Sequence, residues 1–240
     1  MRRGSDSAEV DDAAAAAAMQ LAHRRAVGAP LQYVTGRAGF RRLELEVGPG
    51  VFIPRPETEL VVEHAMARLP PHGTVVDVGT GSGAIALAIA DERPDARVIA
   101  TELFNGARYW AERNRARLGL DIELVAGDLL EGVPASLTHA VDVVVANPPY
   151  IAYSEADALP AEVVDHEPFD ALFADARGMA VIERLAGEAK RQLARGGWLV
   201  VEIAEQRGEE TRALLAGAGY SEVSIHLDLT GRDRIAEGRN

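Results

Sequence analysis

The sequence predicts an α/β fold in which helices cover both faces of a doubly wound, mostly parallel, seven-stranded sheet. Short apolar segments such as 75–78 and 141–145 alternate with longer helical segments along most of the chain. Several of these segments are apolar throughout, which is typical of strands buried on both faces of a parallel sheet. A glycine-rich turn at 79–83 joins the first such strand directly to a helix.

The N-terminal part of the chain predicts a helix followed by a β-hairpin. Residues 6–27 suit a helix, with acidic residues at the start, alanines in the middle and Gly28 as a stop. Residues 36–47 alternate apolar and polar side chains, as a short hairpin does. We therefore expect residues 1–50 to form a short helix and hairpin, and residues 51–240 to form one large domain.

Strands and helices are expected to alternate through the large domain. A helix should begin near Pro54 and Pro56, because proline and the following glutamates suit the first turn of a helix. The last two strands are expected to pair antiparallel, and residues 151–177 form a long connection. The remaining strands are expected at 75–78, 97–101, 122–125, 141–145, 198–203, 222–227 and 233–237, and the remaining helices at 84–91, 107–118, 178–194 and 208–216.

The composition excludes several functional classes. The chain has 240 residues, no cysteine and a net charge of −12, with lysine and arginine dispersed rather than clustered. The lack of cysteine excludes disulfides and thiolate metal sites. No apolar run reaches the roughly 18–20 residues that cross a bilayer, and no signal peptide is recognisable. We expect a cytoplasmic monomer, and the acidic balance argues against a nucleic-acid partner.

The turn at Gly79, Gly81 and Gly83 has the features of a binding site for a nucleotide-like molecule. Glycines let the backbone turn sharply and approach a ligand closely, and the N-terminus of the next helix favours an anion. That anion is either the pyrophosphate of a dinucleotide or the carboxylate of S-adenosylmethionine. Because Ala84 completes the dinucleotide pattern as well, the glycines alone leave both open, together with a turn that binds no ligand.

Acidic residues after the next two strands extend this candidate site. Glu102 ends the second strand, 19 residues after Gly83, where an acid can accept hydrogen bonds from both ribose hydroxyls. An exposed acid at a strand end is the alternative. Asp128 follows the third strand and is placed to receive an adenine amino group, with Leu129 packing against the base.

The sequence Asn147-Pro148-Pro149-Tyr150 follows the apolar strand 141–145 and predicts a site for a planar –NH2 group. The side-chain oxygen of Asn147 and the carbonyl of Pro148 can each accept one amino hydrogen. The nitrogen lone pair then faces an electrophile on the opposite side. Tyr150 is expected to form a wall of the pocket, and the alternative role for Asn147 is that of a turn residue.

Five motifs occur in one order between about residue 25 and the C-terminus: Gly28-Ala29-Pro30-Leu31-Gln32-Tyr33-Val34-Thr35-Gly36, Pro54-Arg55-Pro56-Glu57-Thr58-Glu59, Asp77-Val78-Gly79-Thr80-Gly81-Ser82-Gly83, Asn147-Pro148-Pro149-Tyr150 and Glu167-Pro168-x-x-Ala171-Leu172. In this order and spacing they resemble the glutamine N5-methyltransferase family that modifies peptide chain release factors, a family of class I S-adenosylmethionine-dependent methyltransferases. The fourth motif alone is shared with methyltransferases that act on amino groups of nucleic acids.

The resemblance implies an enzyme that methylates the side-chain amide of a glutamine in a release factor during translation termination, with S-adenosylmethionine as cofactor and S-adenosylhomocysteine as product. It implies Asn147, Pro148 and Tyr150 as catalytic residues, and substrate contacts from these residues, Pro149, Arg55 and Glu167. Together with Asp128, the expected cofactor-binding residues are Gly79, Thr80, Gly81, Ser82, Gly83, Glu102, Leu129 and Asn147.

The chain departs from the family pattern at three places. About 25 residues precede Gly28, where the family has a larger N-terminal helical domain, so residues 1–50 are expected to form a reduced substrate-recognition region. Glu102 replaces the more usual aspartate, and its extra methylene can be absorbed by a small backbone shift. Leu129 stands where some relatives have an aromatic ring.

Three other interpretations remain open. The runner-up is an amino-group methyltransferase acting on N6 of adenine or N2 of guanine in DNA or RNA. The third is an NAD-dependent dehydrogenase, although no histidine and lysine pair for hydride transfer is recognisable. A non-catalytic binding module would keep the fold without affinity for the methyl donor. The six histidines show no metal-ligand spacing, so no metal is expected.

Overall fold

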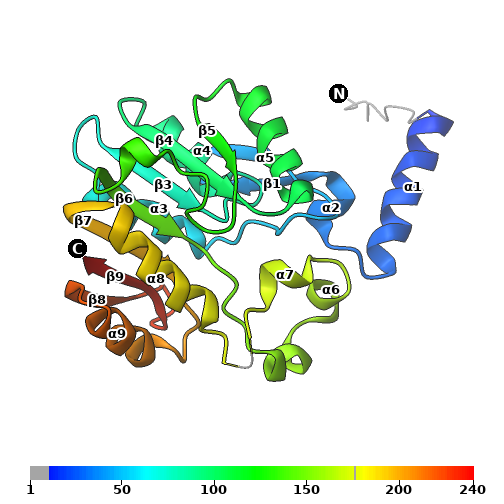
Figure 1. Ribbon diagram of the computed structural model, residues 1–240. Helices are drawn as coiled ribbons and strands as arrows, with labels where there is room; N and C mark the ends of the chain where they lie inside the picture. Colours follow the sequence, from blue (N-terminus) through cyan, green and yellow to red (C-terminus); the bar gives the residue numbers. More distant parts are fainter. Residues whose placement is uncertain (1–10, 176) are drawn as a thin grey trace, which may run out of the picture.

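The computed structural model describes residues 11–175 and 177–240, in which seven strands form one sheet in the order β5-β4-β3-β6-β7-β9-β8 (Figure 1). Helices lie on both faces of this sheet, so the predicted doubly wound, mostly parallel α/β fold is confirmed. The strands are β3 (Thr74–Val78), β4 (Arg97–Glu102), β5 (Glu123–Ala126), β6 (Val141–Ala146), β7 (Leu193–Glu202), β8 (Ser221–Leu227) and β9 (Asp233–Arg239).

Strand β3 lies in the middle of five parallel strands. It pairs with β4 on one side and β6 on the other, with Val76 opposite both Ile99 and Val144. Parallel strands end at one edge of a sheet, so the loops after β3, β4, β5 and β6 all lie at that edge. The final pair, β8 and β9, is antiparallel as expected, and β9 lies between β7 and β8.

Alternate residues of the buried strands face two separate apolar layers. Val75 packs with helices α3 and α4 on one face, whereas the next residue, Val76, packs with α8 and α9 on the other. This alternation is why the strands are apolar throughout. The long helices that cover the sheet are α3 (Thr58–Arg68), α4 (Ala84–Glu92), α5 (Asn105–Leu118), α8 (Ala180–Gln192) and α9 (Gly208–Gly217).

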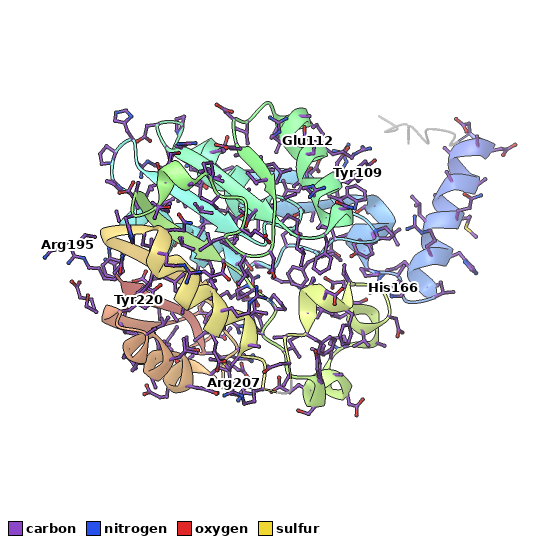
Figure 2. The ribbon with its side chains drawn as sticks, in the orientation of Figure 1. Tyr109, Glu112, His166, Arg195, Arg207 and Tyr220 are labelled. Carbon is purple, nitrogen blue, oxygen red and sulfur yellow. The ribbon has the colours of Figure 1, made fainter. Side chains whose placement is uncertain are left out.

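The N-terminal region contains α1 (Asp12–Ala26), α2 (Leu31–Thr35) and the predicted hairpin of β1 (Arg37–Phe40) and β2 (Leu43–Glu46). Helix α1 has no buried residue, and Figures 1 and 2 show it extending away from the sheet. The predicted helix at 6–27 is confirmed over α1, and residues 6–10 lie outside the described residues. The sequence did not predict α2.

The hairpin packs against the sheet and the helices on one of its faces. Phe40 and Leu45 are almost fully buried and belong to the same apolar layer as α3 and α4. Tyr33 and Val51 form a smaller buried cluster beside them with Ile53. The division of the chain at residue 50 stays a prediction, since these contacts show only that the hairpin and the sheet share a core.

Two segments differ from the expected elements. The connection after β6 contains short helices, η2 (Tyr153–Ala158), α6 (Ala161–Val164) and α7 (Phe169–Leu172). Strand β7 begins at Leu193, within the range predicted as helix, because Leu193 pairs with Val141 and a bulge follows. The short helix η1 (Ala135–Leu137) precedes β6. In the described part of the chain, no helix has the length and apolar character that spanning a membrane requires.

Candidate active site

A cavity of about 460 Å³ lies at the edge of the sheet where the parallel strands end. Its volume falls within the range of roughly 300–1,000 Å³ that is usual for small-molecule sites. Loops after β3, β4, β5 and β6 line it, together with residues from the segments before α3 and around α7. Among the lining residues are ten that the sequence predicted: Gly79, Thr80, Gly81, Ser82, Glu102, Asp128, Leu129, Asn147, Pro148 and Pro149.

The glycine-rich turn between β3 and α4 requires a backbone conformation that other residues adopt rarely. Gly79, Gly81 and Gly83 all have positive φ angles, of +70°, +60° and +87°. No atom lies within 4 Å of the position where a side chain of Gly79 would begin. The turn therefore leaves open space beside its backbone, and it leads directly into the N-terminus of α4, the end of a helix that favours an anion.

The buried side chain of Asp77 stabilises this turn through hydrogen bonds. Its Oδ2 atom accepts hydrogen bonds from Thr80 Oγ1 at 2.6 Å and from the Ala86 N–H at 3.0 Å. Its Oδ1 atom has no hydrogen-bond partner in the described part of the chain. Burial of this fully buried carboxyl raises its pKa to about 7. Asp77 belongs to the sequence motif at 77–83, which did not indicate this role.

Glu102 lies at the end of β4 with both carboxylate oxygens accepting backbone hydrogen bonds. Oε2 accepts from the Gly81 N–H at 2.9 Å, and Oε1 accepts from the Phe104 N–H at 2.8 Å. A carboxylate has about four acceptor positions, so each oxygen keeps one further position. Since Glu102 lines the cavity, its carboxylate can accept two more hydrogen bonds, as from the two hydroxyls of a ribose.

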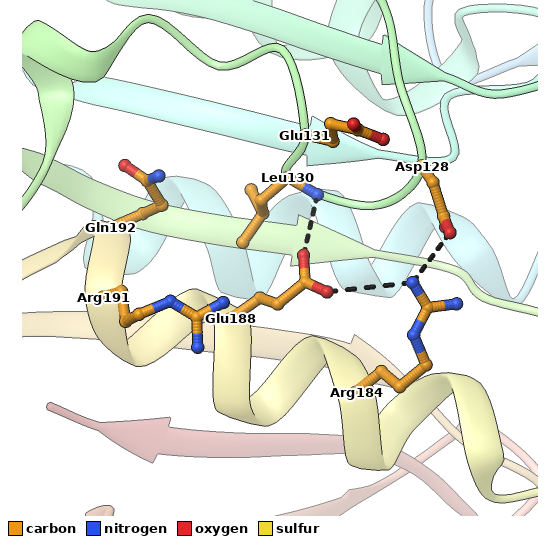
Figure 3. A pocket seen from close by; sticks show the side chains of 7 residues that line it. All are labelled: Asp128, Leu130, Glu131, Arg184, Glu188, Arg191 and Gln192. Carbon is orange, nitrogen blue, oxygen red and sulfur yellow. Dashed lines mark hydrogen bonds and ion pairs between the residues drawn. The ribbon is translucent and has the colours of Figure 1, made fainter.

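Asp128 and Leu129 follow β5 on the far side of the cavity. Asp128 Oδ2 accepts a hydrogen bond from Arg184 Nη2 of α8 at 2.7 Å, and Arg184 also lies 3.8 Å from Glu188. Figure 3 shows these groups beside a second, shallower pocket that shares Asp128 and Arg184 with the main cavity. The Leu129 backbone is fixed by the Thr101 hydroxyl, which donates to its carbonyl at 2.7 Å.

Asn147 lines the cavity directly after β6, and α3 fixes its side chain. The Asn147 Nδ2 group donates a hydrogen bond to Thr58 Oγ1 at 3.1 Å. Its Oδ1 atom makes no hydrogen bond to any other described residue. The Pro148 carbonyl likewise accepts no hydrogen bond from a described residue, and Pro148 lines the cavity beside Asn147, so the two oxygens can act as a pair of acceptors.

Glu202, at the end of β7, lies behind these residues and is almost fully buried. It accepts hydrogen bonds from Thr58 Oγ1 at 2.7 Å and from the Tyr150 hydroxyl at 3.1 Å. Burial raises the pKa of Glu202 to about 6, against the lowering effect of these two hydrogen bonds. Burial also raises the pKa of Tyr150, and the charge of Glu202 adds to this. Thr58 belongs to the motif at 54–59, which did not indicate this role, and no sequence pattern indicated Glu202, although it ends a strand as Glu102 does.

Three predicted substrate residues do not line the cavity. The ring of Tyr150 packs against the apolar layer of α8, and its hydroxyl is bound to Glu202, so it does not form the pocket wall that we expected. Arg55 and Glu167 form an ion pair with each other. Glu167 also accepts a hydrogen bond from the Ile53 N–H at 3.1 Å. This pair ties the segment around α7 to the loop before α3.

A cluster that the sequence did not indicate lies on the sheet face covered by α3. Glu237 of β9 is fully buried and contacts His64 Nδ1 at 2.7 Å, His226 Nε2 at 3.2 Å and Arg68 Nη2 at 2.7 Å. The spacing of the histidines in the sequence does not indicate this cluster, because strand pairing brings distant residues together. The Arg68 guanidinium already binds Oε2 of Glu237, which a metal ion at this cluster would have to share with it.

Comparison with known proteins gives close relatives over most of the chain. Residues 49–172 match the family model of the methyltransferase small domain. The chain is 44% identical over 225 residues to a release factor glutamine methyltransferase of Streptomyces coelicolor, and the match covers 92% of this chain and 79% of that protein. A release factor glutamine methyltransferase of Mycolicibacterium smegmatis is 45% identical, with 94% and 80% covered.

Solved structures with the same fold are more distant in sequence. A methyltransferase from Pyrococcus furiosus superposes with a TM-score of 0.61 at 20% identity, covering 92% of this chain and 96% of that one. A 16S rRNA methyltransferase of T. thermophilus, in complex with AdoMet and guanosine, gives a TM-score of 0.62 at 18% identity, covering 85% and 49%. At these identities the likeness shows the fold. From the close relatives, the chain belongs to the release factor glutamine methyltransferase family.

Proposed function

We propose that this protein transfers a methyl group from S-adenosylmethionine to the side-chain amide nitrogen of a glutamine in a release factor. The observation that carries the proposal is the placement of Asn147. Its carboxamide oxygen and the Pro148 carbonyl accept no hydrogen bond from a described residue, and both residues line the cavity that the glycine-rich turn also lines. The names of the close relatives support the identity of the methyl acceptor.

The donor side of the cavity fits the three parts of S-adenosylmethionine. The open backbone at Gly79 and the start of α4 suit the carboxylate of the methionine part. Glu102 has two acceptor positions left for ribose hydroxyls, and Asp128 with Leu129 suits the adenine. Bound S-adenosylmethionine supplies an electrophilic methyl group on a positively charged sulfur, and it leaves as S-adenosylhomocysteine.

On the acceptor side, Asn147 and Pro148 address the weak nucleophilicity of an amide nitrogen. The nitrogen lone pair is delocalised into the amide carbonyl, so it must be freed as the new bond forms. Asn147 Oδ1 and the Pro148 carbonyl accept one N–H each, which favours a pyramidal nitrogen and stabilises the positive charge that develops on it. These two hydrogen bonds are stronger in the transition state than in the ground state, so they lower the barrier to methyl transfer.

The reaction needs no general base in the cavity. As the nitrogen–carbon bond forms and the carbon–sulfur bond breaks, the nitrogen becomes strongly acidic and loses its proton late, to water. The two acceptors keep the nitrogen in line with the methyl carbon, within the roughly 3–3.5 Å that a productive approach requires. The protein therefore contributes mainly by positioning the substrate nitrogen and by supplying two hydrogen-bond acceptors to it.

The cavity is assembled from one chain, so we propose that a monomer suffices. We also propose the cytoplasm as the compartment, since translation termination takes place there. The runner-up acceptor, an amino group of adenine or guanine in nucleic acid, has the same –NH2 geometry. The net charge of −12 disfavours it, because binding a phosphate backbone depends mainly on lysine and arginine.

The experiment that tests the proposal compares methyl acceptors directly. The purified protein is incubated with deuterium-labelled S-adenosylmethionine and, in separate reactions, with release factor, transfer RNA and duplex DNA. Mass spectrometry should find one labelled methyl group on a glutamine of the release factor and none on nucleic acid. Asn147→Ala serves as the inactive control. Label on nucleic acid alone would show that the acceptor is wrong.

A further inference from the structure

Three hydrogen-bonded side chains from separate parts of the chain lie behind Asn147. Thr58 at the start of α3 contacts both Asn147 and Glu202, and Tyr150 contacts Glu202 from the other side. The three contacts measure 3.1, 2.7 and 3.1 Å in the order Asn147–Thr58, Thr58–Glu202 and Glu202–Tyr150. Glu202 is 1% exposed and Thr58 is 4% exposed, so both side chains are largely shielded from bulk water.

The number of available protons determines the direction of each hydrogen bond. An ionised Glu202 can only accept, so the hydroxyls of Thr58 and Tyr150 must both donate to it. The Thr58 hydroxyl has one proton and has then used it. Thr58 can therefore only accept from Asn147, which requires the Nδ2 side of the carboxamide to face Thr58. The oxygen of that carboxamide is left facing the cavity.

We propose that Glu202 and Thr58 are positioning residues that keep the Asn147 carboxamide oxygen turned toward the substrate nitrogen. This inference rests on the proposed function, because it explains why the Asn147 oxygen faces the glutamine nitrogen in the proposed methyl transfer. Neither residue touches the substrate nitrogen in this account. They act through Asn147, and Tyr150 acts through Glu202 by supplying its second hydrogen bond.

This arrangement makes turnover sensitive to the ionisation of Glu202. A protonated Glu202 has a proton to donate, so Thr58 is free to donate to Asn147 instead, and the carboxamide can turn its NH2 side to the cavity. The raised pKa of Glu202, about 6, places this change just below neutral pH. The charged groups facing Glu202 are Arg234 of β9, which favours ionisation, and Glu57 before α3, which opposes it.

Thr58 gives the cleanest first test. Thr58→Val keeps the shape and removes the hydroxyl, and we expect turnover to fall about tenfold or more with the KM for S-adenosylmethionine unchanged, since bonds to charged groups contribute at this order. Thr58→Ser keeps the hydroxyl and should recover most of the loss. Thr211→Val is the matched control: this threonine of α9 is fully buried and its hydroxyl has no partner among the described residues.

Glu202→Gln tests the charge without changing the size of the side chain. Its amide can donate as well as accept, so it no longer fixes the direction of the Thr58 hydroxyl. In the pH profile of the wild-type protein, turnover should decrease toward acid pH with a midpoint near pH 6. This acid limb of the profile should be absent in Glu202→Gln. Tyr150→Phe should move the limb to higher pH. In Glu237→Gln, which removes another buried charge from the same sheet face, the limb should remain.

A second measurement does not depend on the methyl acceptor. The NMR signal of the isotope-labelled Asn147 side-chain amide should titrate near pH 6 in the wild-type protein, and this titration should vanish in Thr58→Val and Glu202→Gln. If the titration is present but no glutamine is methylated, the proposed function fails while the positioning role stands. If glutamine is methylated while Thr58→Val keeps full turnover and the amide signal does not titrate, the inference is overturned.

Discussion

The two sides of the cavity are built in different ways. On the donor side, the residues proposed to bind the methyl donor come from consecutive strand–loop units between β3 and β5, and four of them belong to the glycine-rich turn at 79–82. On the acceptor side, one side chain, Asn147, depends on Thr58 and Glu202, which lie 144 positions apart in the sequence. The donor side is therefore a local structure, and the acceptor side depends on the tertiary fold.

This difference separates binding from turnover. The donor side offers the free acceptor positions of Glu102 and the open backbone at Gly79, which suit binding of a charged molecule. On the acceptor side, the Asn147 carboxamide can face the cavity with its oxygen or with its NH2 group. This orientation should affect the positioning of the substrate nitrogen and not the binding of the methyl donor. Substitutions on the two sides should consequently change different measured quantities.

The largest effect is expected for Asn147→Ala. Loss of a preorganised polar contact in the transition state should reduce turnover by about a hundredfold or more. Donor binding should stay near the wild-type value, because the glycine-rich turn and Glu102 are unchanged. Single-turnover kinetics and calorimetry with S-adenosylmethionine measure the two quantities. Turnover near the wild-type level would remove Asn147 from the mechanism.

Glu102→Ala should show the reverse behaviour. Two hydrogen bonds from ribose hydroxyls to a carboxylate are lost, together with its support of the Gly81 and Phe104 N–H groups, so the Kd for S-adenosylmethionine should rise roughly ten- to a hundredfold. Turnover at saturating donor should change little. Calorimetry gives the Kd, and an unchanged value would show that the ribose lies elsewhere.

A third comparison separates backbone strain from ligand contact. Gly79 and Gly119, the latter at the end of α5, have similar φ angles of +70° and +65°, and neither has an atom within 4 Å of the added carbon. Each alanine substitution should lower the free energy of unfolding by about 1–2 kcal/mol. Only Gly79→Ala should also weaken donor binding. Equal donor affinities in both variants would place the ligand away from Gly79.

The smallest effect is expected for Arg184→Gln. The pair between Arg184 and Asp128 is largely exposed, and such surface pairs contribute less than about 1 kcal/mol. We expect the melting temperature and the donor Kd to remain close to wild type. A loss of donor affinity above about tenfold would show instead that Arg184 contacts the cofactor.

The sequence predicted that most of the proposed donor-binding residues lie together, because they are close in the chain and have recognisable spacing; Gly83 does not line the cavity. The glycine-rich turn, Glu102, Asp128 and Leu129 all lie where strand order and the loop positions require. It did not predict Thr58 and Glu202 as a pair, because no local pattern relates the start of α3 to the end of β7. The same reason explains the unexpected contacts of Tyr150, Glu167 and Glu237.

The most direct test of the account is a crystal structure with S-adenosylhomocysteine and a glutamine-containing peptide of a release factor. We predict that the glutamine side-chain nitrogen lies at hydrogen-bond distance, about 2.7–3.2 Å, from both Asn147 Oδ1 and the Pro148 carbonyl. That nitrogen should face the sulfur across the cavity. A structure in which the Asn147 oxygen points toward Thr58, or in which the glutamine lies outside the cavity, would contradict the account.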